Sequence, residues 1–140
     1  DASTTYNFSV AVKYVRREIR TLTDRDREIF FTAVSIMQRV PSAVGRELYG
    51  SNYYSKDFFN RMHLYYGARP DCDHWHGGAG FVTAHIGLSL MFEQSLQAIN
   101  PTIALPYWDF TIEGTEYDWS SFRTSEVFAD DWFGAAAPDN

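Results

Sequence analysis

The chain has 140 residues, of which 45% are hydrophobic and 17% aromatic, and its formal net charge is −6. This length suits one domain with a modest core, and the apolar content excludes a disordered chain. The acidic charge balance argues against nucleic acid or an anionic membrane surface as a partner. No apolar run reaches the roughly twenty residues that a membrane-spanning helix needs, so membrane insertion is not expected.

The first strong helical pattern begins after Thr23, a residue type that often caps a helix N-terminus. An acidic first turn supports this start, because negative charge there interacts favourably with the helix dipole. Apolar residues recur at helical spacing from Phe30 to Met37, until Pro41 ends the pattern. The glycine and serine content of residues 42–53 then predicts a loop.

Two further helices are predicted, over residues 56–66 and 82–99. His63 lies on the apolar stripe of the first of these helices, and His85 on that of the second. Residues 71–80 between them are too rich in glycine to hold regular structure. The last third of the chain has many aromatic residues but no long periodic pattern. The sequence therefore predicts a mainly α fold with an irregular, aromatic-rich C-terminal segment.

The four histidines are unevenly distributed: three lie in "CDHWHGGAGFVTAH", residues 72–85, and the fourth is His63. Two antiparallel helices would bring His63 and His85 together, with His74 and His76 in the loop that joins them. A single histidine on an apolar face is more often a satisfied core residue than a ligand. Three imidazoles that converge suit zinc, copper, iron or nickel, and the residues alone do not decide among these metals.

Several segments resemble the N-terminal, copper-A half of the type-3 copper family, which comprises tyrosinases, catechol oxidases and molluscan-type hemocyanins. These segments are "MHLYYG", "HGGAGFVTAH" and "FEQSLQAINPTIALPYWDFT". His76 and His85 have the family spacing of eight intervening residues, and Phe81 matches its phenylalanine four residues before the third ligand. "VRREIRTLTDRDREIFFTAVSIMQ" is also similar to the family's opening helix region. The resemblance therefore extends over nearly the whole chain.

Carried over position by position, the resemblance implies that His63, His76 and His85 are copper ligands. His74 is the alternative to His76, because Cys72 and His74 form a Cys-x-His pair that some fungal and molluscan members link by a thioether. The family spacing favours His76, and Cys72 is expected to be a free, partly buried thiol. The glycines at 77, 78 and 80 are expected to let the loop histidine approach closely.

The surroundings of these ligands agree with the family only in part. The resemblance places Phe81 and Glu93 around the ligands, with Glu93 as a helix-packing or capping partner rather than a proton carrier. Trp108 and Asp109 are expected to anchor the C-terminal segment. The family's "PWHR" reads "TAHIG" here, and Ile86 cannot make the ion pair or stacking contact of an arginine.

Family chemistry uses two coppers, each held by three histidines, and no histidine follows His85. Four imidazoles allow one copper at most. Residues 1–140 are therefore expected to be a single partial domain, the copper-A half of a four-helix bundle without the copper-B half. Such a half would expose an apolar face that another segment or chain covers. That face is expected to include Phe59, Met62, Leu88 and Phe92.

The resemblance implies oxidation of mono- or ortho-diphenols to quinones with O₂ once a second three-histidine copper half is present. One alternative is reversible O₂ binding of the hemocyanin kind, and another is a structural or interaction module without catalysis, so enzyme activity stays open. Asn7, Phe8 and Ser9 form a glycosylation sequon, which favours a secreted glycoprotein.

Overall fold

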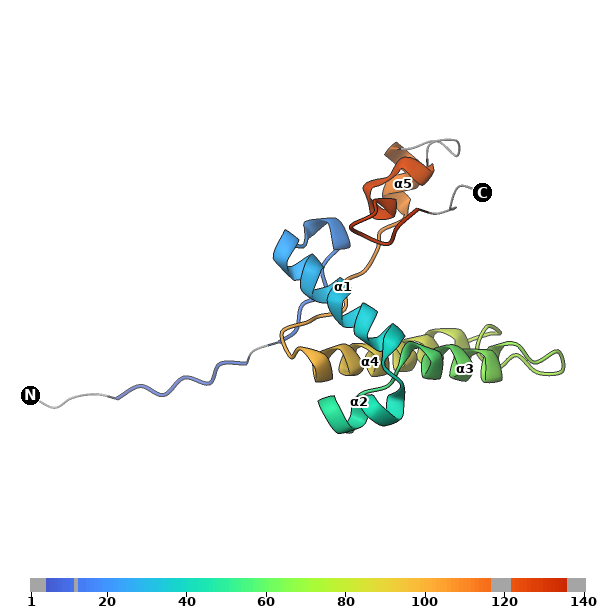
Figure 1. Ribbon diagram of the computed structural model, residues 1–140, viewed down its shortest axis with the longest axis horizontal. Coiled ribbons are helices and arrows are strands. Elements are labelled where there is room, and N and C mark those ends of the chain that lie inside the picture. The colour runs from blue at the N-terminus through green and yellow to red at the C-terminus, as the bar shows by residue number, and fades with distance from the viewer. Residues whose placement is uncertain (1–4, 12, 117–121, 136–140) are drawn as a thin grey trace, which may run out of the picture.

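The computed structural model describes residues 5–11, 13–116 and 122–135. Helices dominate these ranges, in which the only strand-like contact is an isolated parallel bridge between Glu18 and Tyr107. None of the helices described is both long and apolar enough to cross a membrane. The mainly α fold predicted from the sequence is confirmed. Along the described chain (Figure 1) the helices are η1 (Ile19–Thr21), α1 (Asp24–Arg39), α2 (Ser42–Tyr49), α3 (Lys56–Gly67), α4 (Gly80–Ile99), α5 (Thr111–Glu116), η2 (Phe122–Thr124) and η3 (Glu126–Phe128).

Helix α1 begins and ends where the sequence predicts. The Thr23 hydroxyl accepts a hydrogen bond from the Asp26 backbone N–H at 3.1 Å and so caps the first turn. The helix ends at Arg39, before Pro41. Its apolar stripe packs against α3 and α4. The buried residues of this stripe are Phe30, Ala33 and Met37.

Helix α2 corrects the prediction of a loop over residues 42–53. Glycine usually weakens a helix, but Gly45 here lies under the ring of Tyr53, where a Cβ atom would meet Tyr53 Cε1 at 1.9 Å. Tyr53 is fully buried, and its hydroxyl donates to the Val40 carbonyl at 2.8 Å. Gly50 ends the helix with φ +98°. Tertiary packing thus overrides the loop-like composition.

Helices α3 and α4 lie side by side and run antiparallel (Figure 1). Two ring contacts show the register, with centroids 5.3 Å apart for Phe59 and Phe92 and 5.6 Å apart for His63 and His85. As residue numbers increase along α3, the numbers of the residues that they contact on α4 decrease. This is the arrangement that the positions of the two helical histidines predict.

The apolar face expected on this helix pair is smaller than predicted. Phe59 is buried, while Met62, Leu88 and Phe92 are half-buried, because α1 and the C-terminal segment pack over part of the face. What remains is an open groove of about 710 Å³ between α1, α3, α4 and residues 132–133. The lining is mostly apolar, and His63 lies on its wall. The groove therefore adjoins the histidines.

The C-terminal segment is anchored by Glu113 of α5, whose side chain is fully buried. One carboxylate oxygen accepts the Ser125 hydroxyl at 2.6 Å and also contacts the Arg20 guanidinium. The other oxygen accepts the Trp108 indole N–H at 3.0 Å. A buried carboxylate needs such partners, because burial removes the water that would otherwise solvate its oxygens. Trp108 thus has the anchoring role expected of it.

Candidate metal centre

Two of the histidines are placed by helices. His63 projects from α3 and His85 from α4, and both are half-buried where these helices face one another. The ring centroids lie 5.6 Å apart. Because an α-helix fixes the direction of each Cα–Cβ bond, the packing of α3 on α4 sets this separation.

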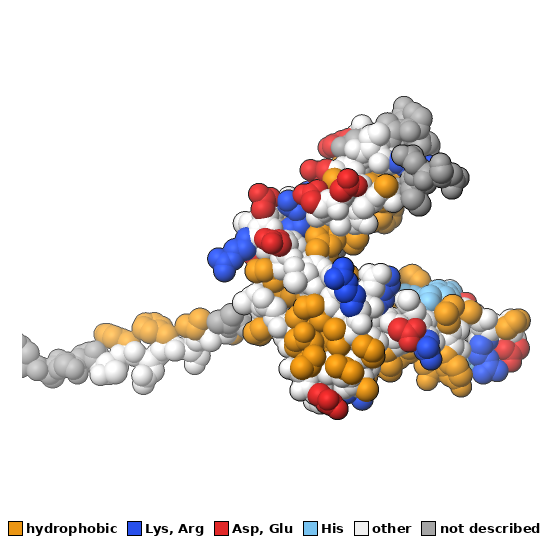
Figure 2. Space-filling view, in the orientation of Figure 1, with side chains coloured by type: hydrophobic (Ala, Val, Ile, Leu, Met, Phe, Trp, Pro, Cys, Tyr) orange, Lys and Arg blue, Asp and Glu red, His pale blue; other side chains and the backbone are white. Residues whose placement is uncertain are grey.

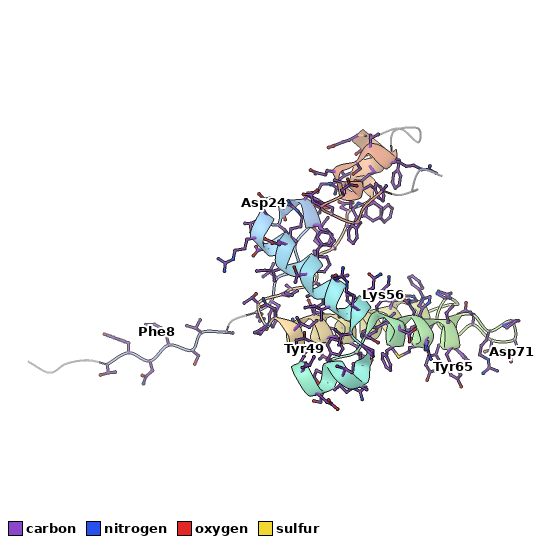
Figure 3. All side chains as sticks on the ribbon, in the orientation of Figure 1. Phe8, Asp24, Tyr49, Lys56, Tyr65 and Asp71 are labelled. Carbon is purple, nitrogen blue, oxygen red and sulfur yellow. The ribbon has the colours of Figure 1, made fainter. Side chains whose placement is uncertain are left out.

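The third ring, that of His76, belongs to the loop between α3 and α4. Its Nε2 lies 3.2 Å from Nε2 of His63. The nitrogens that His63, His76 and His85 offer all lie within 4.8 Å of one another. Figure 2 shows histidine side chains, in pale blue, gathered at the surface over α3 and α4. In Figure 3, Lys56 and Tyr65 mark the course of α3, and Asp71 marks the loop beyond it.

Hydrogen bonds determine which nitrogen of two rings carries the proton. The Phe81 carbonyl oxygen lies 2.7 Å from His85 Nδ1, and the Asp73 carboxylate lies 2.7 Å from His76 Nδ1. Carbonyl and carboxylate oxygens only accept, so Nδ1–H is the donor in each contact, and in the neutral ring Nε2 then keeps its lone pair. Phe81 therefore lies beside His85, and the centroids of the two rings are 4.4 Å apart.

His74 lies outside this cluster. Its ring contacts the Cys72 sulfur instead, with Sγ 3.0 Å from Nε2 and 3.6 Å from Nδ1. Both side chains are exposed, which corrects the expectation of a partly buried thiol. The loop around residues 71–78 is almost entirely at the surface, so it offers no apolar layer to cover Cys72. Whether the pair forms a thioether stays a prediction.

Trp75 forms an aromatic wall that the sequence reasoning missed. Its ring lies 5.7 Å from the His63 ring and 5.8 Å from the His85 ring. It stacks on Tyr66 at 5.4 Å with an interplanar angle of 6°. The position of Trp75 between His74 and His76 in the sequence was the signal that could have identified it. The wall shields one side of the cluster from water.

Gly67 is a second feature that the sequence reasoning missed. A Cβ atom at this last residue of α3 would lie 2.5 Å from Cε1 of His76. The loop glycines have other roles: Gly78 adopts φ +67°, and a Cβ atom on Gly80 would meet the His74 carbonyl at 2.8 Å. The close approach of the chain to the His76 ring therefore depends on Gly67 rather than on the glycines predicted for it.

Glu93 is buried further along α4 and links three parts of the chain. Its carboxylate accepts two hydrogen bonds from the Arg16 guanidinium, at 2.6 and 3.2 Å, and one from the Leu105 backbone N–H at 2.8 Å. The Arg16 hydrogen bonds lower the pKa of Glu93 below its ordinary value, despite the opposing effect of burial. These contacts join α4 to the segments before α1 and after α4, and the place of Glu93 around the ligands stays a prediction.

Replacing Glu93 by Gln is expected to reduce the free energy of unfolding at pH 7 by about 1–3 kcal/mol. A lowered pKa in the folded protein means that the contribution is complete above the usual carboxyl pKa of about 4.3 and is lost as the pH falls through the lowered value. Urea unfolding should therefore show a difference between Glu93→Gln and wild type at pH 7 that narrows in acid. Glu116→Gln, an exposed change in α5, is the control. A difference independent of pH would contradict this assignment.

The fold and the site together define a helical domain in which two packed helices and their connecting loop present three imidazoles to one point. Donors of this type suit transition metals of intermediate softness. All three rings lie at or near the surface of the described part of the chain.

The family model described as the common central domain of tyrosinase matches residues 53–136, and the chain belongs to this family. It is 31% identical to a 5,6-dihydroxyindole-2-carboxylic acid oxidase of Ambystoma mexicanum over 92% of this chain and 28% of that protein. It is 29% identical to grixazone synthase of Streptomyces griseus over 74% of this chain and 31% of that protein. The chain therefore spans less than a third of the length of these curated relatives.

Membership of the tyrosinase family implies copper, and the residues present fit this metal. Imidazole nitrogens lie about 2.0–2.1 Å from a bound first-row ion, so two ligands of one ion are at most about 4.2 Å apart. The Nε2 atoms of His63 and His76, 3.2 Å apart, meet this condition. The nitrogens of the full set lie within 4.8 Å of one another, which is close to this limit. The donor set also matches copper in softness.

Proposed function

We propose that residues 1–140 form the copper-A half of a tyrosinase-like domain, with His63, His76 and His85 as the ligands of one copper ion. The observation that carries this proposal is the convergence of three imidazole nitrogens within 4.8 Å, two of them from antiparallel helices. Membership of the tyrosinase family supports copper as the metal. His74 has no part in the proposed centre.

Bound copper would supply the redox chemistry that converts mono- or ortho-diphenols to quinones with O₂. The protein's part is to hold the rings and shape the surroundings. The Phe81 carbonyl and the Asp73 carboxylate keep protons on Nδ1 and leave Nε2 free to bind. Trp75 limits water on one side. The Ambystoma mexicanum relative is named for oxidising a dihydroxylated aromatic compound, which supports a phenolic substrate.

The second three-histidine copper half is proposed to come from another segment or chain. The groove of about 710 Å³ beside His63 has the apolar lining that helix side chains would cover. Phe133, which is 56% exposed, also lines this groove. The proposed partner thus meets the copper centre and the apolar groove on the same side of the domain.

A structural or interaction module is the competing proposal, and the residue after the third histidine favours it. Ile86 is exposed and apolar where the family pattern has arginine, so this side chain cannot form an arginine's ion pair beside His85. A copper titration of the purified chain separates the two. One copper per chain supports the copper-A half, and no copper supports the module.

Phenol oxidation is then tested after a polypeptide carrying a second three-histidine copper half is added to the copper-loaded chain. The proposal expects quinone formation only in the mixture. Reversible O₂ binding without quinone would indicate the hemocyanin-like alternative. Neither signal from a mixture that forms a stable complex would contradict both.

We also propose that the chain follows the secretory route and carries a glycan at Asn7. Residues 7–9 form the sequon, and they lie exposed in the extended segment before α1, where Phe8 is labelled in Figure 3. This exposure supports access by the modifying enzyme. A mass decrease after glycosidase treatment of the native protein is the expected result, and an unchanged mass would contradict it.

A further inference from the structure

Asp73 uses both of its carboxylate oxygens on the loop that carries His76. Its Oδ1 accepts the backbone N–H groups of Trp75 and His76, at 3.0 and 2.9 Å. Its Oδ2 accepts His76 Nδ1–H at 2.7 Å. The first pair of bonds folds the loop, and the third bond acts on the imidazole ring itself.

Gly67 bounds the same ring from the side of α3. Its carbonyl oxygen lies 3.2 Å from His76 Nδ1, and its missing side chain leaves the space that Cε1 of the ring approaches. With Nδ1 directed at Asp73 and Gly67, the opposite nitrogen, Nε2, is directed at Nε2 of His63, 3.2 Å away. Both the position and the direction of the ring are thus accounted for by two residues.

His76 needs such a device more than the other two histidines do. His63 and His85 are half-buried on helices that pack against each other, whereas His76 belongs to an irregular loop and its side chain is 37% exposed. A free imidazole side chain there would sample several rotamers and both neutral tautomers, and each would have to be lost when a metal binds. A charge-assisted hydrogen bond removes much of this freedom in advance.

We propose that Asp73 is a positioning residue of the metal centre, which holds His76 in the Nδ1–H tautomer with Nε2 directed at the point that His63 and His85 also face. The inference rests on the proposed function of these three histidines as copper ligands. A carboxylate behind a metal-binding imidazole fixes ring orientation and raises the basicity of the ligating nitrogen. Here it would also let an exposed loop residue act as a ligand beside two helical ones.

The substitution Asp73→Asn separates this role from that of a loop turn. An asparagine oxygen can still accept from the backbone N–H groups of Trp75 and His76, so the turn is kept. Its amide nitrogen only donates, so it cannot accept His76 Nδ1–H and instead favours the tautomer with the proton on Nε2. That tautomer removes the lone pair that the centre requires.

Asp71→Asn is the matched control. Asp71 lies in the same loop, is exposed, and pairs with Arg69 at 3.1 Å rather than with a histidine. Two measurements apply to wild type and both variants: long-range proton–nitrogen NMR spectra of the copper-free chain, which identify the His76 tautomer, and the Cu(I) affinity from competition with a chromogenic chelator. Thermal unfolding monitors the fold.

For wild type and Asp71→Asn we expect the Nδ1–H tautomer and equal affinities. Asp73→Asn should show the Nε2–H tautomer and a Cu(I) affinity lower by about 10- to 100-fold. An Nε2–H tautomer in wild type would overturn the inference without any variant, and so would an Asp73→Asn affinity within two-fold of the control. If wild type bound no copper, the proposed function would fail, while the NMR spectra would still decide whether Asp73 sets the tautomer.

Discussion

Replacing His85 by Ala is expected to lower the Cu(I) affinity of the chain by about 100- to 1000-fold, whereas His74→Ala leaves it unchanged. Structural zinc sites with four protein ligands gain about 10–16 kcal/mol in total, so one ligand contributes about 2.5–4 kcal/mol, or about 100- to 1000-fold in affinity. A ring nitrogen of His85 belongs to the cluster, whereas the His74 ring contacts the Cys72 sulfur and lies outside the cluster. Chelator competition measures both affinities.

The two variants test each other because both remove one imidazole from the same part of the chain. Equal losses would mean that His74 and Cys72 contribute to the binding site, in the manner of the family's Cys-x-His pair. A loss of Cu(I) affinity for His74→Ala alone would mean that copper binds in the loop rather than between the helices. Circular dichroism of the copper-free variants checks that neither change unfolds α4.

Replacing Gly67 by Ala is expected to weaken Cu(I) binding by about 10-fold or more while leaving the fold stable. The added Cβ would lie 2.5 Å from Cε1 of His76, so the ring must move. Because that ring ends a side chain in an exposed loop, it moves at little cost to stability. The movement misaligns Nε2 of His76, and Cu(I) binding weakens because it depends on this alignment.

Gly87→Ala is the control for this change. Gly87 also lies in a helix, α4, but a Cβ atom there meets nothing within 4 Å. Alanine favours helix over glycine by up to about 1 kcal/mol, so Gly87→Ala should raise the unfolding free energy and leave copper affinity unchanged. Equal copper affinities for the two alanine variants would show that His76 does not need its observed position to bind.

Helical periodicity was sufficient to predict α1, α3 and α4. Each of them has an apolar stripe, and in each case the start or end lies close to a capping residue or a glycine. Helix α2 escaped prediction because its stability comes from Tyr53 packing on Gly45, a contact that no local pattern encodes. The burial of Phe59 was missed for the same reason, since it depends on the packing of α1 against α3, a tertiary contact between separate helices.

The candidate site was predictable to a similar extent. His63 and His85 follow from periodicity because packed helices must bring their apolar stripes together. The choice of His76 over His74 required the family spacing, since the residue pattern alone left both open. Asp73 and Gly67 were missed because their contacts with the His76 ring depend on the conformation of an irregular loop. Such a conformation follows from specific hydrogen bonds rather than from a repeating pattern.

X-ray absorption spectroscopy at the copper edge of the Cu(I)-loaded chain tests the central proposal most directly, because it identifies the atoms bound to the metal. If the imidazoles at positions 63, 76 and 85 hold the ion, we expect one copper per chain, with three nitrogen ligands from histidine rings and no sulfur ligand. The triple alanine variant at these positions should lose the signal. A sulfur ligand would place the ion at Cys72, and fewer than three imidazoles would leave the observed cluster without the role assigned to it.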